Sequence, residues 1–351
     1  MPGLTKTLMA VAVAGLLAVD GIGIASAQDY GESIKVERLV FDVTVAGEPL
    51  KMVGYLYYHG SYQNRPLQVL LHGATYNHQY WDFASVNGRT YSYARYMAVR
   101  KYAVLALDLP GAGESVVSRN AQTGAPTGPN GQSLTLGESA AAINQVLTAM
   151  KSPTNPTGHA FSPVVLVGHS AGSIGATVVQ GAFGHPADAL VVTASRHLTG
   201  QVLTIPAVQG LVQQLIALVQ VLAPFEYFQL SGTIREALFY RAGAADPAVI
   251  AVDNLTMDWW SNGQLLSTFF AFLDPRVDQP WLVTGKVLIQ VSQHDNLFPG
   301  VFMEDEAALW TGTTPAIQVL EGIGHDFNLH FDREKSWRGI DEWLTANVVA
   351  K

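Results

Sequence analysis

One short stretch constrains the fold of this chain more than any other. The apolar run at residues 164–167 (VVLV) leads directly into the pentapeptide at 168–172 (GHSAG), and residues 174–180 continue with helix-compatible spacing. This order predicts a buried strand, a sharp turn and a helix, with Ser170 exposed at the turn. Glycines on both sides of Ser170 fit a strained turn, where a Cβ would collide with nearby backbone. The alternative interpretation is a chance match, since the chain contains 33 glycines.

Short apolar runs alternate with helix-compatible segments along the rest of the chain. Strands are expected at residues 34–45, 52–58, 67–71, 103–107, 164–167, 190–193, 287–291 and 317–320, and helices at 91–100, 134–150, 173–180, 303–310 and 334–347. The first two strands flank residues 47–49 (GEP), which predicts an antiparallel hairpin. The alternation predicts an α/β fold with a mostly parallel eight-stranded sheet flanked by helices.

Two segments interrupt this alternation. Residues 119–132 are rich in Gly, Pro, Asn and Thr and are expected to form a surface loop. Residues 197–283, called the cap segment below, are much longer than an ordinary connection between neighbouring strands and predict a helical cap insertion. Within the cap segment, residues 203–224 carry no charge. Because a proline and several glutamines interrupt that stretch, a lid or buried helix is favoured over a transmembrane span.

The first 27 residues have the features of a secretory signal peptide. Lys6 precedes an apolar segment at residues 8–19, and residues 25–27 (ASA) form a small-residue cleavage site. We therefore expect secretion to the extracellular space or the periplasm, with a mature chain that begins near Gln28. An uncleaved membrane anchor is the alternative, and it is disfavoured because the apolar segment is short and ends at Asp20.

Composition excludes several classes of function. The formal net charge is −8 and the 20 Lys and Arg residues form no cluster, which argues against a nucleic-acid partner. The chain has no cysteine, so thiol catalysis and cysteine-ligated metals are excluded. The ligand spacings of zinc proteases are also absent, and neither a metal site nor a cofactor is expected. With 351 residues, 48% of them hydrophobic, the chain can form a core that needs no disulfide bonds.

A serine nucleophile requires two partners. Its hydroxyl is almost un-ionised at neutral pH, so Ser170 needs a base within hydrogen-bond reach and an acid that orients the base. An acid follows the expected strand at 287–291, and a histidine follows the one at 317–320. With the GHSAG motif, this order resembles the α/β-hydrolase superfamily, whose triad runs Ser, then Asp or Glu, then His. The resemblance implies an α/β-hydrolase core at residues 28–196 and 284–351, outside the cap segment.

The acid candidate is Asp295 and the base candidate is His325. Asp295 lies just past an apolar strand, at the carboxyl end of the sheet, where ligands bind in open α/β folds. An Asp that only caps a turn is the alternative. His325 follows two glycines on a loop from which an imidazole can reach towards a serine. The rival His330 is expected to be structural, and His294 is expected to point away from the acid.

An oxyanion hole is the third requirement, because a tetrahedral intermediate concentrates negative charge on the former carbonyl oxygen. Residues 70–75 (LLHGAT) follow a strand and resemble the superfamily's oxyanion loop, although they lack its HGGG form. The resemblance implies that the backbone N–H groups of Ala74 and Ala171 bind the oxyanion. Three nearby residues are candidates to border the substrate pocket: Thr75, Tyr76 and His169.

These residues together predict a secreted serine hydrolase. The expected substrate is a small or medium apolar molecule, cleaved at a carboxylic ester through a Ser-His-Asp triad and an acyl-enzyme. Ten aromatic residues crowd residues 225–272 of the cap segment, most of them expected to pack and a minority to line an apolar pocket. The same triad acting on an amide, thioester, lactone or carbon–carbon bond stays open, as does a non-catalytic binding protein of this fold. A stable membrane anchor is not expected, and no oligomeric state is predicted.

Overall fold

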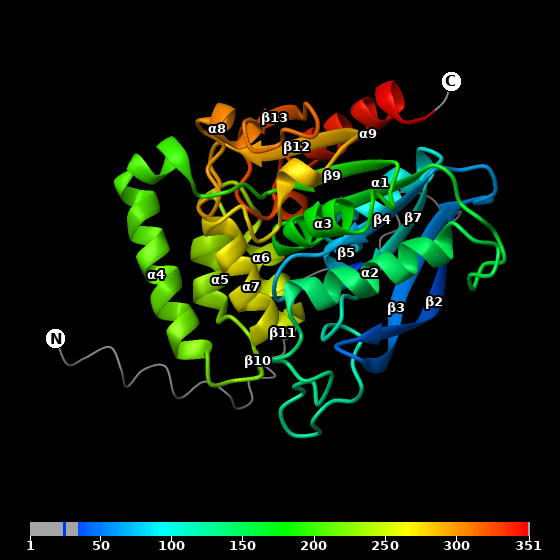
Figure 1. Ribbon diagram of the computed structural model, residues 1–351, viewed down its shortest axis with the longest axis horizontal. Coiled ribbons are helices and arrows are strands. Elements are labelled where there is room, and N and C mark those ends of the chain that lie inside the picture. Colours follow the sequence, from blue (N-terminus) through cyan, green and yellow to red (C-terminus); the bar gives the residue numbers. More distant parts are fainter. Residues whose placement is uncertain (1–23, 26–33, 350–351) are drawn as a thin grey trace.

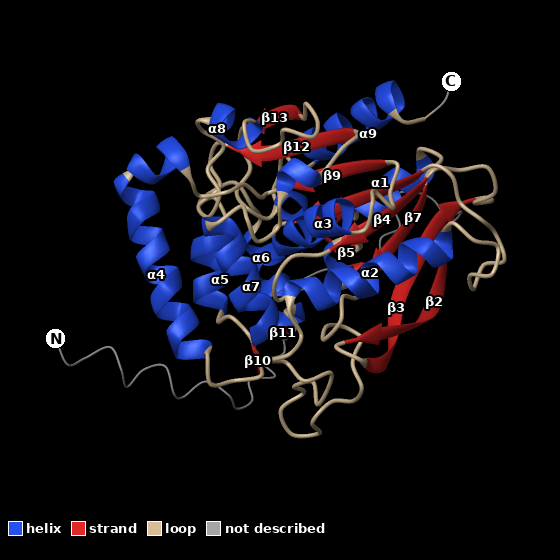
Figure 2. Ribbon diagram, in the orientation of Figure 1, coloured by secondary structure: helices blue, strands red, loops and turns tan. Residues whose placement is uncertain are grey.

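A computed structural model describes residues 24–25 and 34–349 of the chain, and its central feature is an eight-stranded sheet (Figures 1 and 2). In sheet order the strands are β13 (Ala316–Leu320), β12 (Lys286–Ser292), β9 (Ala189–Thr193), β8 (Val164–His169), β4 (Leu67–Leu71), β7 (Ala103–Leu107), β3 (Glu48–His59) and β2 (Ile34–Val45). Pairing is parallel from β13 to β7, and β3 pairs antiparallel with β7 and β2. The predicted mostly parallel α/β sheet is confirmed.

The central strands are buried on both faces. Every residue of β4, β7, β8 and β9 is buried, as expected of mainly apolar strands covered by helices on both sides. Along β8, Val165 and Val167 pack into one hydrophobic cluster, whereas Val164 and Leu166 pack into another. The sheet therefore separates two cores, and alternate side chains of one strand contribute to each.

Helices cover both faces of the sheet (Figure 1). Helices α2 (Leu136–Met150) and α3 (Ala171–Ala182) pack on one face, where Ile143 and Val179 belong to the same hydrophobic cluster. Helices α1 (Tyr93–Val99) and α9 (Glu334–Asn347) pack on the other face. The short helix α8 (Met303–Ala307) follows β12. All five lie at the expected segments, with ends shifted by a few residues.

The hairpin of β2 and β3 differs from its prediction in the turn. The turn was expected at residues 47–49, but Val45 pairs with Glu48, so Ala46 and Gly47 alone form the turn. Their φ angles are 50° and 82°. Positive φ at both central positions defines the type I′ turn, which matches the twist of the strands, and glycine accepts that conformation at the second position.

The cap segment lies to one side of the sheet, on the left in Figure 1. It contains the helices α4 (Pro206–Leu222), α5 (Gly232–Phe239), α6 (Pro247–Thr256) and α7 (Asn262–Leu273), and the short strands β10 (Tyr227–Phe228) and β11 (Trp260–Ser261). In α4 only Val208 and Leu211 are buried, so this charge-free helix lies at the surface. No helix in the described ranges is long and apolar enough to cross a membrane. The limits 197–283 of the cap segment stay a prediction.

Several small elements were not predicted. Strands β5 (Phe83–Val86) and β6 (Arg89–Tyr91) form a hairpin, and β5 also pairs with β1 (Ile24–Ala25). Four described 3₁₀ turns lie at His78–Tyr80, Gly200–Thr204, Pro280–Leu282 and Phe327–Leu329. Strands of two to four residues carry too little periodicity to be recognised from sequence. Apart from Ile24–Ala25, the predicted signal peptide at residues 1–27 lies outside the described residues.

Candidate active site

Ser170 stands at the turn between β8 and α3. Its φ of 53° and ψ of −122° are strained for a residue with a side chain. A Cβ on Gly168 would lie 2.4 Å from the Cα of Ser173, and a Cβ on Gly172 would lie 2.4 Å from the carbonyl oxygens of Leu71 and His72. Both flanking positions therefore require glycine, and the turn presents the Ser170 side chain beyond the end of the sheet.

Ser170, His325 and Asp295 form a continuous hydrogen-bonded relay. The Ser170 Oγ lies 2.9 Å from His325 Nε2, and His325 Nδ1 lies 2.9 Å from Asp295 Oδ2. Asp295 follows β12, and His325 lies on the loop after β13. The other carboxylate oxygen of Asp295 accepts hydrogen bonds from the backbone N–H groups of Leu297, at 2.7 Å, and Phe298, at 2.9 Å. These bonds fix the carboxylate so that Oδ2 faces the imidazole.

The electrostatics of the relay favour a basic imidazole. His325 is 1% exposed, and burial alone would lower its pKa. The negative charge of Asp295 and its hydrogen bond outweigh burial, so the pKa of His325 is raised above its ordinary value. A raised pKa means that the imidazole accepts a proton from a hydroxyl more readily than a free histidine does.

The two other histidines of this region lie apart from the relay. Arg241 N–H donates to His330 Nε2 at 3.1 Å, and His330 Nδ1 lies 2.7 Å from the carbonyl oxygen of Asp326. Burial lowers the pKa of His330, so its ring is neutral and serves as a bridge between two backbone segments. His294 lines a surface groove on the other side of Asp295 that does not include Ser170 or His325. Of the three candidates, the structure brings only His325 to Ser170.

Ala74 and Ala171 flank Ser170 and line the same cavity. Ala171 is the first residue of α3, where a helix leaves backbone N–H groups without intrahelical acceptors. The loop with Ala74 packs closely against the serine, because a Cβ on Gly73 would lie 3.1 Å from the Ser170 Cβ. Two backbone segments thus lie close to the nucleophile, and their role as an oxyanion hole stays a prediction.

The wall of this cavity differs from the one expected from sequence. Thr75, Tyr76 and His169 were candidates to border it, but all three are buried outside its lining. Thr75 accepts a hydrogen bond from Arg235, Tyr76 bonds to Asp326, and the His169 ring stacks on Tyr80. Polar side chains of the oxyanion loop and of the turn around Ser170, called the elbow below, point towards buried partners, which leaves the cavity wall to apolar side chains.

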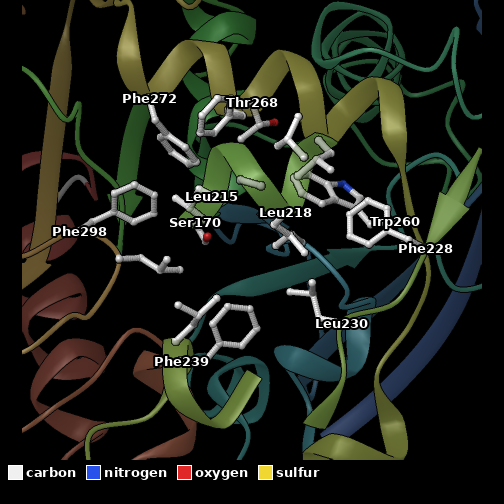
Figure 3. A pocket seen from close by; sticks show the side chains of 17 residues that line it. Ser170, Leu215, Leu218, Phe228, Leu230, Phe239, Trp260, Thr268, Phe272 and Phe298 are labelled. Atoms are coloured by element: carbon white, nitrogen blue, oxygen red, sulfur yellow. The ribbon is translucent and has the colours of Figure 1, made fainter. Parts of the chain in front are cut away.

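The cavity is walled mainly by the cap segment (Figure 3), and the space inside it that the centre of a water molecule can occupy is about 90 Å³. Its lining consists of Ala74, Ser170, Ala171, Leu215, Leu218, Val219, Phe228, Leu230, Leu238, Phe239, Trp260, Leu265, Thr268, Phe269, Phe272, Leu297 and Phe298. Figure 3 shows Ser170 among leucine and aromatic side chains that surround it. A minority of the ten aromatic residues at 225–272 was expected to line this wall, and five of the ten do so.

Sequence reasoning missed two groups of polar residues. Arg235 and Asp253 form a fully buried ion pair inside the cap segment, and His197 lies buried between two carboxylates. A charged residue within an apolar helical stretch could have indicated a buried ion pair. The neighbouring residues in the sequence do not show which residue is its partner. In the described ranges no group of three or more His, Asp or Glu side chains is arranged to hold a metal ion.

Comparisons with known proteins agree with this architecture. A protein-family model described as the alpha/beta hydrolase family matches residues 68–335. A search of curated proteins finds no significant match.

Several solved structures have a similar fold. A monoacylglycerol lipase from Paleococcus ferrophilus is 17% identical, with a TM-score of 0.55 over 89% of this chain and 99% of that one. A thermophilic esterase from Thermogutta terrifontis is 16% identical, with a TM-score of 0.55 over 88% and 98% of the two chains. A putative lipase from Acinetobacter baumannii is 16% identical, with a TM-score of 0.56 over 91% and 93%. At these identities the likeness concerns the fold alone.

Proposed function

The chain belongs to the alpha/beta hydrolase family, and from that membership we propose that it is a serine hydrolase that cleaves a carboxylic ester of a small or medium apolar substrate. One observation carries the proposal: the Ser170 hydroxyl, hydrogen-bonded to His325 and through it to Asp295, opens into an apolar cavity. A nucleophile, a base and an orienting acid in that order meet the chemical requirements of acyl transfer.

The first half of the reaction forms an acyl-enzyme. His325 Nε2 takes the proton from Ser170 Oγ as that oxygen attacks the ester carbonyl carbon. The Asp295 carboxylate stabilises the imidazolium through Nδ1, and the N–H groups of Ala74 and Ala171 stabilise the oxyanion. Collapse of the intermediate breaks the bond to the alcohol oxygen, which leaves with the proton held by His325. Loss of one oxyanion donor typically costs about 3 kcal/mol of transition-state stabilisation.

The second half releases the acid. A water molecule loses a proton to His325 as its oxygen attacks the acyl carbon, and Ser170 Oγ regains the proton when it leaves. Because only a neutral imidazole accepts a proton, activity falls as the pH drops through the pKa of His325. That pKa lies above 6.5, since Asp295 raises it.

The cavity wall supports an ester rather than an amide. Apart from Ser170, Thr268 and the indole of Trp260, the lining side chains that the structure describes are hydrocarbon. An amide brings an N–H donor, which is costly to bury without an acceptor, whereas an ester brings none. Apolar groups of the substrate gain about 25 cal/mol for each Å² removed from water. Substrates with charged or strongly polar groups near the scissile bond are therefore disfavoured.

Hydrolysis of a panel of substrates tests the proposal. Activated esters of increasing acyl length, an amide, a thioester and a lactone are incubated with the protein and with Ser170→Ala as the blank. We expect turnover of the esters by the wild-type protein and a loss of roughly 10⁶-fold in kcat for the variant. If the protein hydrolysed the amide or the lactone but none of the esters, the ester assignment would be wrong and the catalytic triad would still stand.

A serine-directed phosphonate separates catalysis from binding. The reagent should label Ser170 in the folded protein, because the same oxygen attacks phosphorus. Folded protein that neither takes the label nor turns over any ester would support a non-catalytic binding role. Normal ester turnover by Ser170→Ala would show that another residue is the nucleophile.

We also propose that the protein is exported. The signal-peptide features of residues 1–27 support this location. Determination of the N-terminus of the protein purified from its source should give a chain that starts near Gln28. An intact N-terminus on protein recovered from the cell interior would contradict it.

A further inference from the structure

A buried network of polar side chains joins the cap segment to the oxyanion loop. Arg235 on α5 donates through Nη2 to both carboxylate oxygens of Asp253 on α6, at 2.8 and 2.9 Å. Its other terminal nitrogen, Nη1, donates to the Thr75 Oγ1 at 2.5 Å and lies 3.4 Å from the Thr75 carbonyl oxygen. All three side chains are fully buried. None of them takes part in the chemical steps above.

Thr75 holds an uncommon backbone conformation directly after Ala74. Its φ is 61°, in the left-handed region that a β-branched residue rarely adopts. Such strain persists only where surrounding contacts enforce it. The cap segment supplies two of these contacts: the Arg235 guanidinium, and the backbone N–H of Asp258, which donates to the Thr75 carbonyl oxygen at 2.9 Å.

The same network reaches the loop of the catalytic histidine. The Tyr76 hydroxyl lies 2.5 Å from Asp326 Oδ2 and 3.2 Å from Asp253 Oδ2. Asp326 directly follows His325. The carboxylate that Arg235 binds is therefore linked through the Tyr76 hydroxyl, by two hydrogen bonds, to the side chain of the residue after His325. Thr75 is one residue from Ala74, the proposed oxyanion donor.

We propose that Arg235 is a positioning residue for the oxyanion loop: through Thr75 it holds the backbone turn that directs the Ala74 N–H towards the reacting oxygen. The inference rests on the proposed function. A guanidinium is suited to the task, because its planar fork binds the Asp253 carboxylate through one nitrogen and keeps another donor for the Thr75 hydroxyl. The cap segment thus contributes to the transition state as well as to the apolar wall.

Two single variants and their combination test this role. Arg235→Gln removes the guanidinium, and Thr75→Val removes only the hydroxyl that receives it while keeping the branched shape. With a short acetyl ester, which makes little use of the apolar wall, we expect each variant to lower kcat roughly 10- to 100-fold at nearly unchanged KM. Because both changes break one contact, the double variant should be little worse than either single variant.

Arg276→Gln is the matched control. Arg276 also lies in the cap segment and pairs with Asp274, but its side chain is 83% exposed. Exposed pairs of this kind contribute little, so kcat and KM should equal those of the wild-type protein. Phosphonate titration counts the competent sites in each preparation, and kcat is expressed per titrated site, which removes any effect of a partly unfolded fraction.

Arg235→Gln leaves the Asp253 carboxylate buried without its counterion, and it is therefore expected to unfold more easily. The double variant Arg235→Met and Asp253→Leu avoids that charge, and we expect it to melt near the wild-type temperature while kcat stays low. Wild-type kcat in this folded variant and in Thr75→Val would overturn the inference, as would strictly additive effects. Full activity in Ser170→Ala would instead overturn the proposed function, so the two failures are distinguishable.

Discussion

Two buried histidines of this protein have similar surroundings and opposite consequences. His325 has one carboxylate, Asp295, on Nδ1 and the Ser170 hydroxyl on Nε2. His197 has carboxylates on both nitrogens: Glu306 lies 3.1 Å from Nδ1, and Asp278 lies 3.0 Å from Nε2. Both side chains are 2% exposed. The two histidines differ in the group that faces Nε2, which is a hydroxyl for His325 and a carboxylate for His197. They also differ in location, because Ser170 lines the apolar cavity and His197 does not.

The second carboxylate changes the protonation of the ring. Burial alone would lower the pKa of His197, but the charge of Glu306 and the hydrogen bonds to Asp278 and Glu306 raise it to about 10. His197 is therefore a permanent imidazolium at neutral pH and cannot act as a base. A histidine with one carboxylate and a hydroxyl can exchange a proton, whereas a histidine between two carboxylates forms a fixed ionic contact.

That ionic contact joins the two ends of the cap segment to the core. His197 is its first residue, Asp278 lies shortly before its end, and Glu306 belongs to α8. The backbone N–H of His197 also donates to Glu306 at 2.8 Å, and the Trp310 indole donates to the same carboxylate at 2.9 Å. We expect His325 to control activity and His197 to control stability, and four predictions follow from that contrast.

Replacing the relay histidine should give the largest effect. In His325→Gln the base is lost, and kcat for an activated ester should fall by about 10⁶-fold. The protein should remain folded, because a neutral side chain of similar size takes the place of the imidazole. Steady-state hydrolysis and circular dichroism measure the two properties. If the variant were unstable but its folded fraction kept normal kcat, His325 would be a structural residue, which is the role expected of His197.

Removal of the charge on the orienting acid should have a smaller effect on activity. Asp295→Asn keeps the shape but no longer stabilises the imidazolium, and the amide favours the wrong tautomer of His325. We expect kcat to fall by roughly 10⁴-fold. Single-turnover hydrolysis measures the chemical step directly. A decrease of less than tenfold would indicate that another carboxylate orients the ring.

Replacing the structural histidine should reverse the pattern. His197→Gln leaves Glu306 and Asp278 as buried carboxylates without a counterion, which should cost about 3–5 kcal/mol of the free energy of unfolding. Urea denaturation followed by tryptophan fluorescence measures this loss. Below the transition, kcat per titrated site should stay within about twofold of the wild-type value, since His197 lies outside the cavity. A large loss of kcat with unchanged stability would contradict the assignment.

The smallest effects should come from pH. The folded pKa of His197 is about 10, above its ordinary value of 6.5, so its contribution to stability is complete below pH 6.5 and is lost as the pH rises through 10. Activity should change in the opposite direction, because the neutral fraction of the His325 imidazole grows as the pH rises through its raised pKa. Melting temperatures and kcat/KM between pH 6 and 10 measure both trends.

The variant His197→Gln is the control for the alkaline loss of stability. If the imidazolium causes it, the decrease in melting temperature between pH 7 and 10 should be smaller in this variant than in the wild-type protein. Equal decreases in the two proteins would assign the loss to other groups.

The sheet and the elbow could be predicted because their signals are local. Short apolar runs such as AVLAL in β7 and VVLV in β8 are compatible with few environments other than a doubly covered strand. The sharp turn at Ser170 needs glycine at positions 168 and 172, and that need is visible in the sequence. The predicted turn of the first hairpin began one residue too late, because Ala46 adopts a positive φ that an alanine in the sequence does not indicate.

The sequence by itself determined the order of strands and helices, the nucleophilic turn and the sequence order in which a base and an acid follow it, because each depends on backbone preferences and on short-range periodicity. Only the tertiary structure decided which side chains meet. Arg235 reaches Thr75 across 160 residues, and His197 reaches Glu306 across 109. Such contacts depend on how the cap segment packs over the sheet. The energy of a buried charge is set by partners that spacing along the chain does not encode.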